Sequence, residues 1–130
     1  VMEDPGYKKR KKGAPKFELV TFTHKKHVED YKISCGECHH DDKGQPLDLK
    51  EGDDVQNCIE CHKIPSTVPK DIKKEWKAKK IKKAEQNKMK LEYHAEAIHM
   101  NCIACHKKWN KENKSKAAPT SCSKCHPKTK

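Results

Sequence analysis

Most of this chain has apolar side chains that are too few and too irregularly spaced to predict regular secondary structure. Two segments are exceptions. Residues 17–23 alternate in side-chain character and are rich in β-branched and aromatic residues, which predicts a short strand. Residues 71–91 place Ile72, Trp76 and Ile81 among many lysines, which predicts one helix, although only Ile72 and Trp76 form an i, i+4 pair. We therefore expect mainly irregular loops with a few α-helices and a short N-terminal strand or hairpin.

The remaining segments are polar and differ mainly in charge. Residues 1–16 combine six basic side chains with two Gly and two Pro, which is typical of a flexible basic arm. The rest of the chain, residues 17–130, has the length of one small domain. Residues 41–60 carry seven acidic side chains and two lysines, with Gly and Pro among them, and indicate an acidic loop without the residue spacing of an EF-hand. Residues 107–118 predict a polar linker.

The composition leaves too little apolar surface for a core made of side chains. Only 32% of the 130 residues are hydrophobic, 38% are charged, and the mean hydropathy is −1.18. Ordering the backbone costs about 1–2 kcal/mol per residue, and a chain of this composition cannot offset that cost by burial. Another component must supply the interior, and we expect the chain to be unfolded without it.

The cysteines identify that component. All eight occur in four copies of C-x-x-C-H, the spacing of c-type haem attachment, in which two sulfurs bond to the macrocycle and the histidine binds the iron. Zinc sites, redox dithiols and disulfides also use C-x-x-C, but none of them requires a histidine after every second cysteine. Four motifs without a spare cysteine predict four covalently bound c-type haems. The motifs are Cys35, Cys38 and His39; Cys58, Cys61 and His62; Cys102, Cys105 and His106; and Cys122, Cys125 and His126.

Five further histidines can supply second axial ligands. Four haems with two imidazoles each need four of these five histidines in addition to the motif histidines, so one histidine remains. His39 and His40 cannot close the same iron, because axial ligands approach from opposite faces, so His40 serves another haem or none. His24 and His27 lie three residues apart, which suits two neighbouring haems, although a chance pair of surface histidines would have the same spacing. The five are His24, His27, His40, His94 and His99.

The charge favours acidic partners. The formal net charge is +11, and the haem propionates lower it without reversing it. A moderately basic protein suits electrostatically steered docking on acidic proteins. Residues 70–90 alone carry a net +7. Membrane-surface binding by this segment is less favoured because its apolar face is broken, and nucleic-acid binding by residues 1–16 is less favoured than partner docking. We therefore expect no nucleic-acid partner. We also expect no membrane insertion, since no 18-residue apolar run occurs.

Together these residues resemble the tetrahaem cytochromes c3, the class III c-type cytochromes of sulfate-reducing bacteria. The resemblance covers residues 22–126 and rests on the Phe-x-His-x-x-His opening, the doubled histidine of the first motif and the three later motifs. It implies a small multihaem cytochrome fold packed around four haems, with Phe22 against the first haem. Many members have four residues between the cysteines of the second and fourth motifs, whereas this chain has two, so the subgroup stays open. The implied axial pairs are His24 with His39, His40 with His62, His27 with His106, and His99, or alternatively His94, with His126.

The resemblance also implies a function. Bis-His ligation gives low potentials, and saturated irons imply an electron carrier, not an enzyme. The implied role is periplasmic transfer from hydrogenase to membrane-associated multihaem cytochrome complexes in sulfate respiration. The implied docking lysines lie in residues 70–90 or are Lys107, Lys108, Lys124 and Lys128. We expect a monomer from which an export signal has been removed. The alternatives are a multihaem reductase of oxyanions or metal ions, which needs an open iron, and a haem module of a larger transmembrane cytochrome.

Overall fold

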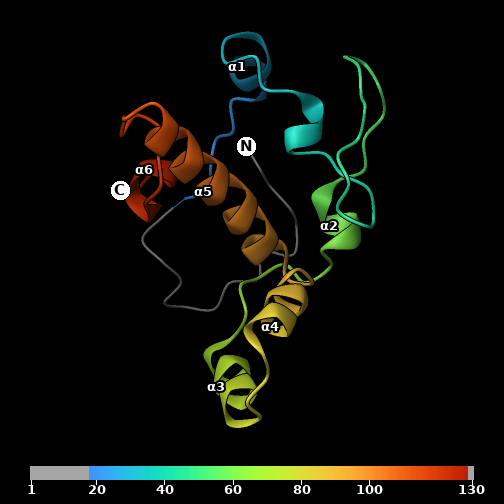
Figure 1. The fold of residues 1–130 in the computed structure, drawn as a ribbon, viewed down its shortest axis with the longest axis vertical. Helices are drawn as coiled ribbons and strands as arrows, with labels where there is room; N and C mark the ends of the chain where they lie inside the picture. Colours follow the sequence, from blue (N-terminus) through green and yellow to red (C-terminus); the bar gives the residue numbers. More distant parts are fainter. Residues whose placement is uncertain (1–17, 129–130) are drawn as a thin grey trace.

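The computed structural model describes residues 18–128 and shows helices joined by long irregular segments (Figure 1). The expected fold class is confirmed, since the described range has little strand: two isolated bridges pair His40 with Pro46 and Ile64 with Tyr93, and Lys128 is one further bridge residue. The predicted arm of residues 1–16 lies outside the described residues. The helical elements are α1 (His24–Glu29), η2 (Cys35–Glu37), α2 (Cys58–Cys61), α3 (Lys70–Ala78), α4 (Lys83–Lys90), α5 (His94–Glu112) and α6 (Cys122–Cys125).

The strand predicted for residues 17–23 is wrong in its described part, because residues 18–23 form no strand. Alternating side chains make a strand only where a neighbouring strand completes the hydrogen-bond ladder. Here the backbone N–H of Glu18 donates to the carbonyl of Pro127 (2.7 Å), and the chain enters α1 at His24. The segment therefore ties the beginning of the described chain to its end and delivers His24 and His27 to one helical turn.

The single helix predicted for residues 71–91 is instead a helical hairpin of α3 and α4. Lys80 adopts a left-handed conformation, with φ +53°. The N–H of Lys80 donates to the carbonyl of Lys77 (3.1 Å), and the N–H of Ile81 donates to that of Trp76 (3.0 Å). These two bonds form a Schellman motif, which satisfies the last carbonyls of α3 and ends it. The sequence does not indicate this helix end, because a lysine occupies the left-handed position where glycine is usual.

The linker predicted for residues 107–118 is wrong in its first half, where α5 continues to Glu112. A second Schellman motif then ends α5: Lys114 has φ +47°, and the N–H of Ser115 donates to the carbonyl of Asn110 (2.8 Å). The exposed Trp109 lies on this last part of the helix. The apolar periodicity that would have predicted α5 is missing because cysteines and histidines occupy many of its positions.

The polypeptide has almost no core of its own. Within the described range three side chains are buried, Val68, Trp76 and Ala97. The accessible surface is 10932 Å², whereas roughly 7,000 Å² is typical of a compact protein of this mass. Val68 precedes α3, Trp76 lies on α3 and Ala97 lies on α5. The segments that carry the C-x-x-C-H motifs are held by loops and backbone hydrogen bonds instead.

Candidate haem-binding sites

Each C-x-x-C-H motif lies on a turn of helix. The first, second and fourth motifs form η2, α2 and α6, and the third lies inside α5. In the three short elements the histidine N–H donates to the carbonyl of the first cysteine, at 2.8 Å for His39, 2.9 Å for His62 and 2.8 Å for His126. Residues three apart on such a turn share a face. The turn therefore presents both sulfurs on one side and delivers the histidine directly after them.

The motif histidines each face a second histidine from elsewhere in the chain. The four ring pairs have similar spacing although their partners come from different elements and are separated by 15 to 79 residues. The distances between ring centres are 6.4 Å for His24 and His39, 6.1 Å for His40 and His62, 6.3 Å for His27 and His106, and 6.1 Å for His99 and His126.

This spacing fits one metal ion between each pair of imidazoles. An imidazole nitrogen lies about 2 Å from a first-row metal, and the ring centre lies ~1 Å further out, so two ligands on opposite sides have centres roughly 6 Å apart. Direct packing of the rings does not account for the same spacing in all four pairs, since the interplanar angles range from 21° to 73°. The residues present therefore fit the iron of a haem at each of the four positions.

Hydrogen bonds to the backbone orient five of these imidazoles. A carbonyl oxygen only accepts, so the Nδ1 atom of each ring must carry the proton, which leaves the lone pair of Nε2 for a metal. Ligating histidines commonly have such an outer partner, and it fixes the ring and raises its basicity. The Nδ1 donors and their acceptors are His27 with Thr23 (2.9 Å), His40 with Asp41 (2.7 Å), His62 with Leu91, His106 with Pro119 (2.6 Å) and His126 with Glu18 (2.8 Å).

The two candidates for the partner of His126 occupy different places on α5. The ring of His99 lies opposite that of His126. His94 begins α5, where its backbone N–H donates to the carbonyl of Ile64 (2.8 Å). Burial lowers the pKa of His99, and the neighbouring His126 lowers it further, against an opposite effect of Glu96. Of the two, His99 has the geometry of an axial ligand.

Phe22 lies between two of the pairs. Its ring centre is 6.0 Å from that of His24, edge to face, and 4.8 Å from that of His27. His24 faces the first motif and His27 faces the third. Phe22 therefore contacts two imidazoles that face different motifs, and its position against the first haem stays a prediction.

The cysteines form no disulfides. All eight lie in the described range, and all are free thiols. Burial raises the pKa of Cys38, as do its neighbours Cys105 and Glu37. Burial likewise raises the pKa of Cys102 and that of Cys125. Within residues 18–128, no three His, Cys, Asp or Glu side chains are grouped to hold a metal ion, so this part of the chain lacks the geometry of a structural zinc site.

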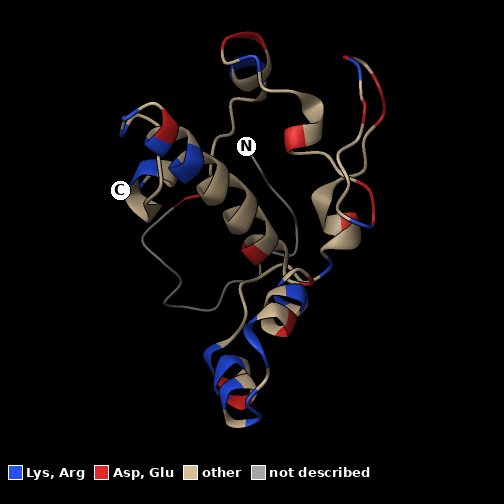
Figure 2. Cartoon of the chain, viewed as in Figure 1, with Lys and Arg blue, Asp and Glu red and all other residues tan. Residues whose placement is uncertain are grey.

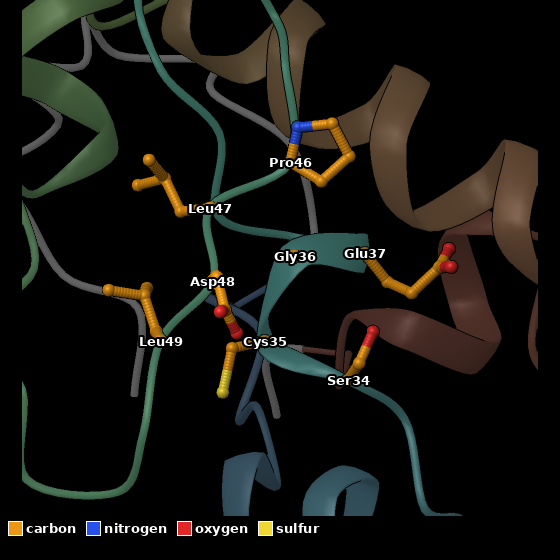
Figure 3. A pocket seen from close by; sticks show the side chains of 8 residues that line it. All are labelled: Ser34, Cys35, Gly36, Glu37, Pro46, Leu47, Asp48 and Leu49. Atoms are coloured by element: carbon orange, nitrogen blue, oxygen red, sulfur yellow. The ribbon is translucent and has the colours of Figure 1, made fainter.

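A hollow of about 270 Å³ lies beside the first motif (Figure 3). Residues 34–37 form one wall and residues 46–49 the other. Figure 3 shows the side chains of Leu47 and Leu49 on the same side of their segment. A Cβ atom on Gly36 would lie 2.9 Å from both the Leu47 carbonyl oxygen and the Pro46 Cβ. The close approach of the two walls therefore requires glycine at position 36.

The backbone acceptors of the imidazole protons were not predictable from the sequence. The acceptors for His62, His106 and His126 lie 29, 13 and 108 residues away. Any residue type can supply a carbonyl, so no side-chain pattern marks these positions. The motifs and the additional histidines, in contrast, were all visible as residue types.

None of the helices within residues 18–128 is long and apolar enough to cross a bilayer. No curated protein and no solved structure matches the chain. The model of the class III cytochrome c family matches residues 3–126, which is nearly the whole sequence. The chain therefore belongs to the class III cytochrome c family, and it is a multihaem electron carrier that binds c-type haem covalently.

Proposed function

We propose that the protein is a low-potential electron carrier with four bis-His c-type haems. The observation that carries this proposal is the set of four imidazole pairs, each joining one C-x-x-C-H histidine to a histidine from another segment at 6.1–6.4 Å. The proposed axial pairs are His24 with His39, His40 with His62, His27 with His106, and His99 with His126.

When bound, the haems supply reversible one-electron chemistry between ferric and ferrous iron. The chain holds them at three points each, through two cysteine sulfurs and a motif histidine, and closes the opposite face with the second histidine. Hydrogen bonds from Nδ1 to backbone carbonyls hold five of the eight imidazoles in their ligating orientation. Imidazole on both faces favours low potentials, because methionine in place of histidine raises the potential.

Two axial imidazoles at each iron leave no position for a substrate, which supports a carrier over an enzyme. The four pairs use eight of the nine histidines. A multihaem reductase would need one motif histidine without a facing histidine. Each of the four motif histidines has a facing histidine. This arrangement supports the electron-carrier proposal over the oxyanion or metal-ion reductase.

We further propose a periplasmic role between hydrogenase and membrane-associated multihaem cytochrome complexes in sulfate respiration. The support is the resemblance to the cytochromes c3 and the basic surface, which suits steered encounters with acidic redox proteins. The candidate docking lysines are exposed except for Lys90: they lie in α3, α4 and the turn between them, near the end of α5, in α6 and just after it (Figure 2).

The decisive experiment measures haem stoichiometry and axial ligation in the holoprotein. Intact mass and a pyridine haemochrome assay should give four covalent haems per chain. Electron paramagnetic resonance of the ferric protein should show only low-spin iron, and carbon monoxide should not bind the reduced native protein. A high-spin component or carbon monoxide binding would instead favour the reductase, and fewer than four haems would refute the tetrahaem assignment.

A further inference from the structure

The hairpin of α3 and α4, residues 70–90, is the most strongly charged surface of the described chain; we call it the basic hairpin. It contains ten lysines and three acidic residues, and nine of the lysines are exposed. In Figure 2 the lysines cover the part of the molecule that projects furthest from η2, α1 and α6. Its large apolar side chains face inward, with Trp76 buried and Ile72 and Ile81 half-buried. The outer surface therefore offers charge without a patch of large apolar side chains.

The basic hairpin is fixed at its base. The backbone N–H of Ile64 donates to the carbonyl of Glu92 (3.0 Å), and the N–H of His94 donates to the carbonyl of Ile64 (2.8 Å). The Glu96 carboxylate accepts the N–H of Val68 (3.2 Å) and lies 3.2 Å from Nζ of Lys73. These contacts clasp the hairpin onto α5. A surface held in this way loses little conformational freedom when a partner binds, which favours docking.

The same base contacts the second haem motif. His62, which follows α2, donates its Nδ1 proton to the carbonyl of Leu91, the residue that caps α4. The hairpin is thereby bonded directly to a proposed axial ligand. The fourth motif, on α6, faces the first half of α5, where His126 lies opposite His99. Of these two motifs, the second is the one joined to the hairpin by a direct hydrogen bond, from His62 to the Leu91 carbonyl.

The acidic loop that precedes the second motif adds a directional effect. Residues 41–60 carry seven acidic residues and two lysines, a net −5. An acidic protein approaching the second motif is repelled on the side of this loop and attracted on the side of the hairpin. Opposite charges on two sides of one site orient an encounter as well as accelerate it.

We propose that the basic hairpin is the docking surface for an acidic redox protein and that the second motif is the point where the electron enters or leaves. This inference rests on the proposed electron-carrier function and specifies its partner surface. Cys58 and Cys61 would attach the second haem through its macrocycle, and His62 and His40 would ligate its iron. In the direction of reduction, this haem would take up one electron from the reduced partner, which would be oxidised. A lipid surface would match the charge but has no electron to exchange.

The test compares two holoprotein variants with equal charge change. In the first, Lys70, Lys74, Lys82 and Lys83 become Glu, which turns the hairpin charge from +7 to −1. Three of these positions lie at helix N-termini, where acidic side chains are favourable, so the fold should persist. In the second, Lys107, Lys108, Lys124 and Lys128 become Glu. Haem content and circular dichroism should match the native protein in both.

The probe is a small acidic ferredoxin made redox-inert by gallium substitution, titrated into ¹⁵N-labelled protein. Shifts should concentrate in residues 70–90 and 55–64. The hairpin variant should lose affinity by at least about tenfold at low salt, whereas the second variant should lose much less. High salt should weaken native binding.

Three results would overturn the inference. Shifts at residues 121–128 with loss of affinity only in the second variant would move the docking site to the fourth motif and leave the proposed function intact. Absence of ferredoxin binding in every form would also remove the acidic-partner part of the proposed function. Tight binding of the native hairpin to anionic phosphatidylglycerol vesicles, with no ferredoxin binding, would reassign the surface to lipid.

Discussion

The imidazole of His62 donates its Nδ1 proton to the backbone carbonyl of Leu91, 29 residues later in the chain. Leu91 follows α4 directly, and His62 follows α2, so this bond joins the basic hairpin to the second haem motif. An Nδ1 hydrogen bond tunes the basicity of a ligating imidazole and hence the metal that it binds. The hairpin is therefore part of the environment of the second haem motif.

Replacement of His99 by Ala should open one iron, whereas replacement of His94 by Ala should open none. His99 faces His126 at 6.1 Å, while His94 starts α5 beside Ile64. Ferric His99→Ala should show one high-spin haem among four by electron paramagnetic resonance, and its reduced form should bind one carbon monoxide. His94→Ala is the matched control with four low-spin haems. The reverse pattern would assign the fourth haem to His94.

Stability around α3 should depend on the ionisation of Glu96. Burial opposes its charge, but the hydrogen bonds from Lys73 and Val68 and the charges of Lys73 and Lys90 outweigh burial and lower the pKa of this carboxyl. A lowered folded-state pKa stabilises the fold fully above the unfolded-state pKa, and this contribution is lost as the pH falls through the folded-state value. Hydrogen exchange of α3 amides should accelerate at acid pH.

Glu96→Gln should remove most of this pH dependence and accelerate α3 exchange at neutral pH. Glu85→Gln, which neutralises an exposed carboxylate on α4, is the control and should change little. Equal hydrogen-exchange rates of the α3 amides in the two variants would show that the contacts of Glu96 with Val68 and Lys73 do not stabilise the hairpin.

Gly36→Ala should disturb the first motif. The added methyl group would lie 2.9 Å from the Leu47 carbonyl oxygen and the Pro46 Cβ, so residues 46–49 must move. Such overpacking costs about 1–3 kcal/mol. Thermal unfolding of the holoprotein should report this loss. Gly44→Asn serves as the control, because Gly44 has open space around it and asparagine tolerates its φ of +78°. An unchanged Gly36→Ala protein would mean that the two walls are not packed.

Lys80→Gly should stabilise the basic hairpin. Lys80 sits at φ +53°, in the left-handed region that disfavours a side chain by about 1 kcal/mol. Glycine removes this penalty at the helix stop of α3. Lys77→Gly makes the same charge change inside α3 and should destabilise it by about 1 kcal/mol. The midpoint of chemical denaturation, monitored by far-ultraviolet circular dichroism, should move in opposite directions for the two variants.

The chain without haem should be unfolded. Within residues 18–128 three side chains are buried, Val68, Trp76 and Ala97, and none of them belongs to a haem motif. A variant with all eight cysteines changed to Ser, expressed without haem attachment, should give a random-coil circular dichroism spectrum. A cooperative thermal transition in that variant would show that the polypeptide supplies its own core.

The sequence predicted the chemical groups of the site more fully than the helices that carry them. Cysteine and histidine are rare residue types with few roles, so four repeated motifs were visible without any structure. The helix stop at Lys80 and the continuation of α5 through Trp109 were missed. The first depends on the left-handed backbone conformation of Lys80, and the second on a helix in which cysteines and histidines occupy many positions. Neither feature produces a regular spacing of apolar residues in the sequence.

The sequence by itself determined that this protein has four C-x-x-C-H motifs and five further histidines, because covalent attachment and ligation require particular atoms at particular spacings. The tertiary structure decided that His99 faces His126, and that the carbonyls of Leu91, Pro119 and Glu18 orient distant imidazoles. The physical reason is that every residue has a carbonyl and several histidines have equivalent rings. Only the path of the backbone selects among groups that are chemically alike.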